Sequence, residues 1–217
     1  MIIALDCDEV LLATGPVVKD FYLATIDPAA EIPDGVYSSY WPVWGERGSE
    51  EAKLEWLRFL DDYTHSEYLT KSLPVEGAAD GVRALAALGH KLHVLTAIGD
   101  DEDVKRRRVR HLRSLFGDAF EDIVCIGPFE KKKDWLVRMD AGALIDDGTS
   151  NISGALELGL LGVLFRCAEN SALIDEIMST GRVEQSFWRR DGSLVRDKAV
   201  IADGWRGAVR AIEKSPA

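Results

Sequence analysis

The stretch IIALDCDEVLL, residues 2–12, decides the fold class of this 217-residue chain. Its apolar start, with two isoleucines, is typical of a buried strand, which we expect over residues 2–6. Two aspartates, Asp6 and Asp8, follow at the end of that strand. One acid in such a place is usually a turn former or a helix cap. The side chains that follow the other strands of the chain therefore decide how these two acids are interpreted.

Strands and helices alternate from about residue 76 onward. Apolar runs predict strands over 91–97, 122–126, 143–146 and 161–166. Helical spacing predicts helices over 77–88, 102–115, 132–139 and 151–158. Beyond residue 168 we expect a helix over 170–179, a hairpin turning at Asp191-Gly192 and a helix over 204–214. This alternation is typical of an α/β fold with a parallel, Rossmann-like sheet covered by helices on both faces.

Residues 13–75 interrupt this pattern and are rich in aromatic side chains. Within them, Ser49 is a suitable N-cap for a helix over 49–65. The apolar residues of that helix recur at helical spacing and are Leu54, Leu57, Phe59 and Leu60. We therefore expect a small, mostly helical cap at 13–75, inserted after the first strand of a core domain formed by 1–12 and 76–217.

Four aromatic residues of the insert have two interpretations, and the sequence leaves both open. They are Tyr37, Tyr40, Trp41 and Trp44. Their rings could stack on a base or another flat substrate. They could equally form the small core of the cap, which has little else to bury.

Composition excludes several classes of protein. Apolar residues make up 47% of the chain and charged residues 29%, as in ordinary globular proteins. The net charge of −11 argues against a nucleic-acid polymer or an anionic membrane as partner. No apolar run reaches the ~18–20 residues that span a bilayer, and we expect no signal peptide. Three widely spaced cysteines favour reduced thiols, so we expect a cytoplasmic protein, and the oligomeric state stays open.

Reactive side chains follow several of the predicted strands. Ligands bind open parallel sheets at the carboxyl ends of the strands. The residues expected at that edge are Asp6, Asp8, Thr96, Asp146, Asp147 and a lysine of 131–133. Each alone has an ordinary explanation as a turn, a strand former or a solvated charge. Together they favour a site, and clustered carboxylates favour a bound divalent cation such as Mg²⁺.

Helical periodicity distinguishes between the lysines. Lys132 precedes Trp135 by three residues and Leu136 by four, so it shares their apolar face. Lys133 is rotated by about 100° from Lys132 and should point toward solvent. The sequence therefore predicts Lys132 as the lysine of the site.

Four motifs resemble those of the haloacid dehalogenase superfamily of phosphatases. They are DCDEV (6–10), VLTA (94–97), Lys132 and LIDDG (144–148). The resemblance implies a small helical C1-type cap, which residues 13–75 match in place and size. The cap and Val10 are also similar to the 5'(3')-deoxyribonucleotidase branch, although those enzymes usually carry Gly where this chain has Glu9.

The resemblance implies a role for each residue. Asp6 would attack phosphorus to form an aspartyl-phosphate, and Asp8 would act as general acid and base. Thr96, the Ala97 amide and Lys132 would bind phosphate. Asp6, the Asp8 carbonyl and Asp147 would ligate Mg²⁺, with Asp146 orienting them. The substrate would be a small phosphorylated metabolite such as a (deoxy)nucleotide.

Other classes of function fit the sequence less well. A phospho-accepting receiver would carry its reactive aspartate after the third strand, where this chain reads VCIGPFE. A regulatory protein that binds phosphate without turnover would not need the complete acid and lysine set. Dehalogenation at carbon would not need Asp8, because no leaving oxygen requires a proton.

Overall fold

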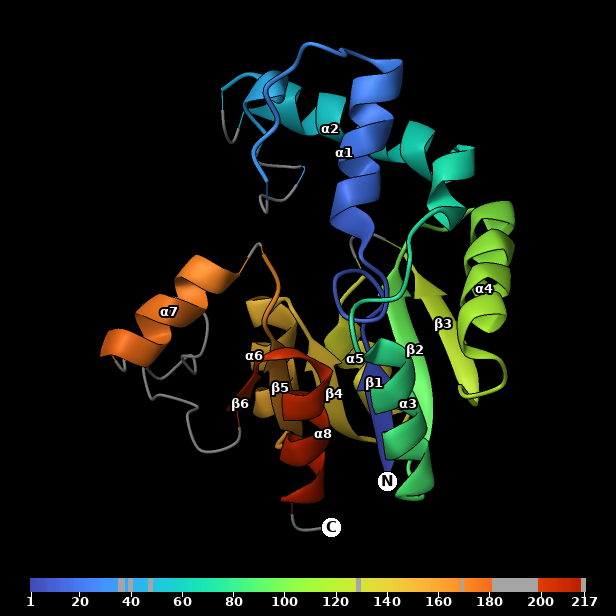
Figure 1. The fold of residues 1–217 in the computed structure, drawn as a ribbon, viewed down its shortest axis with the longest axis vertical. Coiled ribbons are helices and arrows are strands. Elements are labelled where there is room, and N and C mark those ends of the chain that lie inside the picture. The colour runs from blue at the N-terminus through green and yellow to red at the C-terminus, as the bar shows by residue number, and fades with distance from the viewer. Residues whose placement is uncertain are drawn as a thin grey trace.

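The computed structural model describes residues 1–34, 38, 41–46, 49–127, 130–168, 170–180 and 199–215. Its centre is a sheet of parallel strands in the order β3-β2-β1-β4-β5-β6 (Figure 1). The strands are β1 (Ile2–Leu5), β2 (Lys91–Ala97), β3 (Asp122–Ile126), β4 (Ala141–Asp146), β5 (Leu161–Phe165) and β6 (Ala199–Ala202). The predicted Rossmann-like α/β fold is therefore confirmed.

Helices cover both faces of the sheet because its central strands are apolar on both sides. Along β1, Ile3 and Leu5 join one core cluster and Ala4 joins the other. The first cluster includes residues of α3 (Ala78–Ala87), α4 (Glu102–Phe116) and α8 (Gly204–Glu213). The second includes residues of α5 (Lys132–Arg138), α6 (Thr149–Glu157) and α7 (Ser171–Thr180).

The insert lies beyond the carboxyl ends of the strands, as Figure 1 shows for α1 (Thr14–Thr25) and α2 (Glu50–His65). The described residues of the insert also include two short 3₁₀ helices, η2 (Pro42–Trp44) and η3 (Glu67–Thr70). The chain enters and leaves the insert side by side, because Ala13 N–H donates to Leu73 O and Val75 N–H donates to Leu11 O, both at 2.9 Å. The division into cap and core domains stays a prediction.

An aromatic cluster forms the interior of the insert. Trp41 is buried and packs against Tyr22, Phe59 and Trp44 with ring centroids 5.7–6.1 Å apart. Trp41 and Trp44 therefore belong to the core of the cap, as one of the two interpretations expected. Trp41 also lines a cavity, so stacking of its ring on a flat substrate stays a prediction. Tyr37 and Tyr40 lie outside the described residues.

The predicted elements differ from the structure at a few places. Strand β4 begins two residues earlier than expected, and strand β6 was not predicted. Ser49 caps α2 by accepting the Ala52 N–H at 3.1 Å, as expected, but Leu54 is 52% exposed instead of packed. The hairpin expected at Asp191-Gly192 lies outside the described residues. None of the described helices combines the length and apolarity needed to cross a membrane.

Candidate active site

A buried cluster of three carboxylates and one ammonium lies at the carboxyl edge of the sheet. Carboxylate oxygens of Asp6, Asp146 and Asp147 lie within 4.8 Å of one another. The Lys132 ammonium is 2.6 Å from Asp6 Oδ1 and 2.8 Å from Asp146 Oδ2. Lys133 instead pairs at 2.5 Å with Glu157 on the adjacent helix α6. The structure thus brings Lys132, and not Lys133, to the acids.

Strand register explains why these side chains meet. Ala4 of β1 is the register partner of Leu144 of β4, and both belong to the core cluster on the α5 face. Asp6 lies two residues after Ala4, and Asp146 lies two residues after Leu144, so both side chains point to the same face of the sheet. Lys132 begins α5, and Leu136, one turn later, is buried in that cluster.

Burial and like charge make this cluster unstable without a counter-charge. Burial and the neighbouring Asp146 raise the pKa of Asp6 well above its usual range, against the opposing effect of Lys132. Burial alone would lower the pKa of Lys132, but Asp146 and Asp6 outweigh burial and raise it. One ammonium does not balance three carboxylates, and their oxygens are donors of the kind that Mg²⁺ prefers. The cluster therefore has the composition of a metal site.

Hydrogen bonds hold Asp146, the last residue of β4, and Asp147, which follows it. Asp146 Oδ1 accepts from the Gly148 N–H at 2.8 Å and from Asn151 Nδ2 at 3.0 Å. Asn170 Nδ2 donates to the carbonyls of Asp147 at 3.0 Å and Phe165 at 2.7 Å. Asn170 thereby ties the loop after β4 to the end of β5, a role that the sequence did not indicate.

Asp8 lies apart from this cluster and has its own partners. Its Oδ1 accepts from the Thr14 hydroxyl at 2.6 Å and is 3.1 Å from Arg108 Nη2. Arg108 is fully buried and also donates to Cys7 Sγ at 3.4 Å. Cys7 belongs to the core cluster on the face opposite to Asp6, and burial raises the pKa of its thiol. Cys7 is thus a packed thiol that separates two acids with different surroundings.

Arg108 is buried although it lies within a run of cations on α4. Lys105 and Arg106, earlier in that run, pair with the acids Glu102 and Asp103 of the same helix. Arg108, however, follows the buried Val104 by one turn and precedes the buried Leu112 by one turn. This i, i+4 spacing was the signal in the sequence, and the run of cations obscured it.

Two of the three predicted phosphate-binding residues, Thr96 and Ala97, lie at the end of β2. Thr96 is fully buried, and its hydroxyl has no hydrogen-bond partner among the residues described. Ala97, the next residue, lines a cavity that also reaches Asp8 and Arg108. Buried polar atoms are usually satisfied in native structures, so the Thr96 hydroxyl is a suitable ligand for an atom from outside the chain.

Glu9 joins the strand end to the insert. Its φ of +58° lies in the left-handed region, which favours glycine. Its Oε1 accepts from the Gly15 N–H at 2.6 Å, in the first turn of α1. A carboxylate is favourable at a helix N-terminus. Glu9 therefore anchors the entry to the insert.

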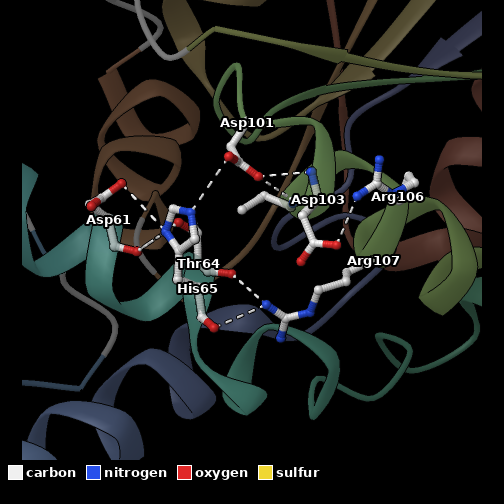
Figure 2. Close-up of polar contacts among 8 residues, drawn as sticks. Asp61, Thr64, His65, Asp101, Asp103, Arg106 and Arg107 are labelled. Atoms are coloured by element: carbon white, nitrogen blue, oxygen red, sulfur yellow. Dashed lines mark hydrogen bonds and ion pairs between the residues drawn. The ribbon is translucent and has the colours of Figure 1, made fainter.

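A second set of polar contacts joins the insert to α4 (Figure 2). Arg107 donates to the carbonyls of Thr64 at 3.2 Å and His65 at 3.1 Å, and also to that of Ser66, at the carboxyl end of α2. His65 lies between Asp61, with Nδ1 at 3.5 Å from Oδ1, and Asp101, with Nε2 at 3.9 Å from Oδ2. Cations near a helix C-terminus are favourable, so these contacts fix α2 over the edge of the sheet.

Comparison with known proteins finds similarity at the level of structure. No protein-family model and no curated protein matches the sequence. A predicted phosphatase from Clostridium acetobutylicum superposes with a TM-score of 0.66 at 14% identity, over 99% of this chain and 98% of that one. A haloacid dehalogenase-like hydrolase from Streptococcus pneumoniae gives 0.60 at 13%, over 93% of each chain. L-2-haloacid dehalogenase from Xanthobacter autotrophicus, with chloropropionic acid covalently bound, gives 0.58 at 13%, over 99% of each. The chain shares the fold of these hydrolases.

Proposed function

We propose that this chain, whose fold is that of the haloacid dehalogenase-like hydrolases, is a Mg²⁺-dependent phosphatase of small phosphomonoesters. The observation that carries the proposal is the buried group of Asp6, Lys132, Asp146 and Asp147 at the carboxyl edge of the sheet. A second acid, Asp8, lies two residues from Asp6 on the wall of a cavity.

Asp6 and Asp8 would divide the chemistry between them. An oxygen of Asp6 attacks phosphorus and the bond from phosphorus to the ester oxygen breaks, while Asp8 gives its proton to that leaving oxygen. Water then attacks the aspartyl-phosphate, Asp8 takes up its proton, and inorganic phosphate leaves with Asp6 regenerated. Contacts to Asp6 Oδ1 from the Cys7 N–H at 2.7 Å and from Lys132 support a fixed carboxylate.

The three-carboxylate cluster supports the assignment of Mg²⁺. Asp6 and Asp147 would hold the ion together with the Asp8 carbonyl, and Asp146 would orient that arrangement through its contacts to Lys132 and Gly148. A bound Mg²⁺ supplies charge stabilisation to a transferring phosphoryl group. Lys132 and the Thr96 hydroxyl would bind the phosphate oxygens.

Two alternatives differ at Asp8. Attack at carbon, as in a dehalogenase, needs no acid for a leaving oxygen, whereas Asp8 lies at the cavity and is held by Thr14 and Arg108. A regulatory protein could accept or bind phosphate at Asp6 without turnover. The presence of Asp8 beside Asp6 favours an enzyme over such a regulatory protein, because Asp8 would activate the water that releases phosphate.

Release of phosphate from p-nitrophenyl phosphate tests the proposal. We expect hydrolysis with Mg²⁺, loss of hydrolysis with EDTA, and no hydrolysis by Asp6→Asn, whose circular dichroism should match that of the unchanged protein. Full activity of Asp6→Asn would overturn the mechanism. A phosphorylated Asp6 that accumulates and does not turn over would favour the regulatory alternative.

A further inference from the structure

A large cavity lies between the insert and the core. Its volume is about 870 Å³, and its walls come from α1, α2, the loop after β2 and the start of α4. Asp8, Ala97 and Arg108 lie at its core side. A phosphoester bound at Asp6 would therefore place its leaving group in this space, and the walls of the cavity decide which leaving groups fit.

One wall of the cavity is apolar. Helix α2 contributes Trp56, Leu57 and Leu60, which are half-buried and face the cavity. Val18 of α1 and Ile98 after β2 extend this surface. Trp56 donates through Nε1 to Ser38 Oγ at 3.0 Å, which fixes its ring. Such a wall favours a flat or aliphatic group over a strongly hydrated one.

The polar wall is acidic, and its cations are already paired. Lys19 is 2.6 Å from Asp34 Oδ1, and Arg108 is 3.1 Å from Asp8 Oδ1. His65 lies between Asp61 and Asp101. Besides Asp8, the carboxylates that line the cavity are Glu9, Asp20, Asp34, Asp61, Asp100 and Asp101. Within the described residues neither Asp20 nor Asp100 forms an ion pair, so the lining carries excess negative charge.

We infer that the substrate is a monophosphate whose leaving group is apolar or aromatic and carries no second anionic group. This inference rests on the proposed function and deepens it. Lys132 and the proposed Mg²⁺ would offset the charge of the transferred phosphate at the Asp6 cluster, but a second phosphate or a carboxylate would face Asp20 and Asp100 without a free cation among the described lining residues. Sugar bisphosphates and phosphorylated carboxylic acids are therefore poor substrates, and uncharged aryl or nucleoside monophosphates are good ones.

Two substrates of nearly the same shape test the charge selection. 4-Carbamoylphenyl phosphate and 4-carboxyphenyl phosphate differ mainly in one negative charge. With Mg²⁺ at low ionic strength, we expect kcat/KM to be at least ~10-fold higher for the carbamoyl compound, and we expect added salt to reduce this ratio. Asp20→Lys should also reduce it, because the variant gains a cation on the wall.

A pair of leucine variants tests the apolar wall. Leu57→Ala should raise KM for 2-naphthyl phosphate about 3-fold to 10-fold, because it removes a contact with the ring. Leu54→Ala, on the same helix but 52% exposed and outside the cavity, should leave KM unchanged. Equal kcat/KM for the two phenyl phosphates, or equal KM for Leu57→Ala and Leu54→Ala, would overturn this inference and leave the proposed function standing. Hydrolysis of none of these esters would overturn the proposed function and the inference with it.

Discussion

Lys132 is a buried cation held between two acids, and this arrangement predicts its effect on rate. Lys132→Ala should lower kcat/KM for p-nitrophenyl phosphate by ~10²-fold or more, because it removes a preorganised charge from the phosphoryl site. Lys133→Ala is the matched control, since Lys133 pairs with Glu157 on the surface. Loss of activity in the Lys133 variant with retention in the Lys132 variant would contradict the assignment.

Arg108 is predicted to matter first for stability, through its pair with Asp8. Removing one partner of a buried pair costs ~3–5 kcal/mol, because the other charge is left uncompensated. The Asp8 side chain is 35% exposed, so Arg108→Met should lower the free energy of unfolding by about 2–3 kcal/mol, near or below the low end of that range. Urea unfolding measures this loss. The loss should be smaller when Arg108→Met is made in the Asp8→Asn variant. Equal costs in both backgrounds would show that Arg108 acts by packing alone.

Individual residues show which parts of the site could be predicted from sequence. Asp6, Asp146 and Lys132 were predictable because strand alternation and helix periodicity fix the face on which each lies. Asn170, just before α7, and Thr14, the first residue of α1, were not, because a single amide or hydroxyl at the start of a helix carries no periodic signal. Glu9 was recognisable only as a departure from glycine, and its φ of +58° explains why glycine is favoured there.

At the scale of elements, the junction between α2 and α4 has a predicted dependence on pH. A hydrogen bond to the Asp61 carbonyl and the carboxylates of Asp61 and Asp101 raise the pKa of His65 above 6.5. A raised pKa means that this stabilisation is complete below the unfolded value and is lost as pH rises through the folded value. The Tm of His65→Gln should therefore lie further below that of the unchanged protein at about pH 5.5 than at about pH 8, as measured by thermal unfolding.

His90 provides a control of opposite sign for this prediction. Burial lowers the pKa of His90 in the folded protein, so the stability that His90 contributes is present at high pH and is lost as pH falls. The Tm of His90→Gln should accordingly lie further below that of the unchanged protein at the higher pH. The same pH trend in both variants would mean that the contacts in Figure 2 do not set the behaviour of His65.

The contact between α3 and α8 depends on a glycine. A Cβ on Gly81 would lie 2.2 Å from Trp205 Cε3, and the indole is held by its 2.8 Å hydrogen bond to the Val10 carbonyl. Gly81→Ala should therefore destabilise the protein by ~1–3 kcal/mol in urea unfolding, as overpacking does. Gly154→Ala on α6, where the nearest atom is Lys133 Cβ at 3.4 Å, should be neutral or stabilising by up to ~1 kcal/mol. Equal stability of the two variants would contradict this explanation.

At the scale of the whole molecule, alternation of strands and helices was enough to predict a parallel sheet with two covered faces. It did not predict β6, because a four-residue strand at the edge of the sheet has too short a pattern to identify. Nor did it predict the cavity, because its walls come from α1, α2 and α4, which are distant in sequence and meet only when the insert folds over the sheet.

Binding of Mg²⁺ at the three-carboxylate cluster should stabilise the entire fold. A ligand that binds only the folded state stabilises it by ~2.7 kcal/mol at a hundredfold excess over Kd. For a chain of this size, Mg²⁺ at such a concentration should raise Tm by about 5–10 °C. The increase should come from the three buried carboxylates that Lys132 alone does not balance.

Two variants separate that site from general screening of a chain with a net charge of −11. Asp147→Asn should abolish the increase in Tm, because it removes a donor from the cluster. Asp118→Asn, at a fully exposed acid outside the cluster, should retain the increase. Sodium chloride at equal ionic strength should not reproduce it, because screening acts on all surface carboxylates alike. An equal increase in Tm for the unchanged protein, Asp147→Asn and Asp118→Asn would mean that Mg²⁺ acts on surface charges and does not bind at the cluster.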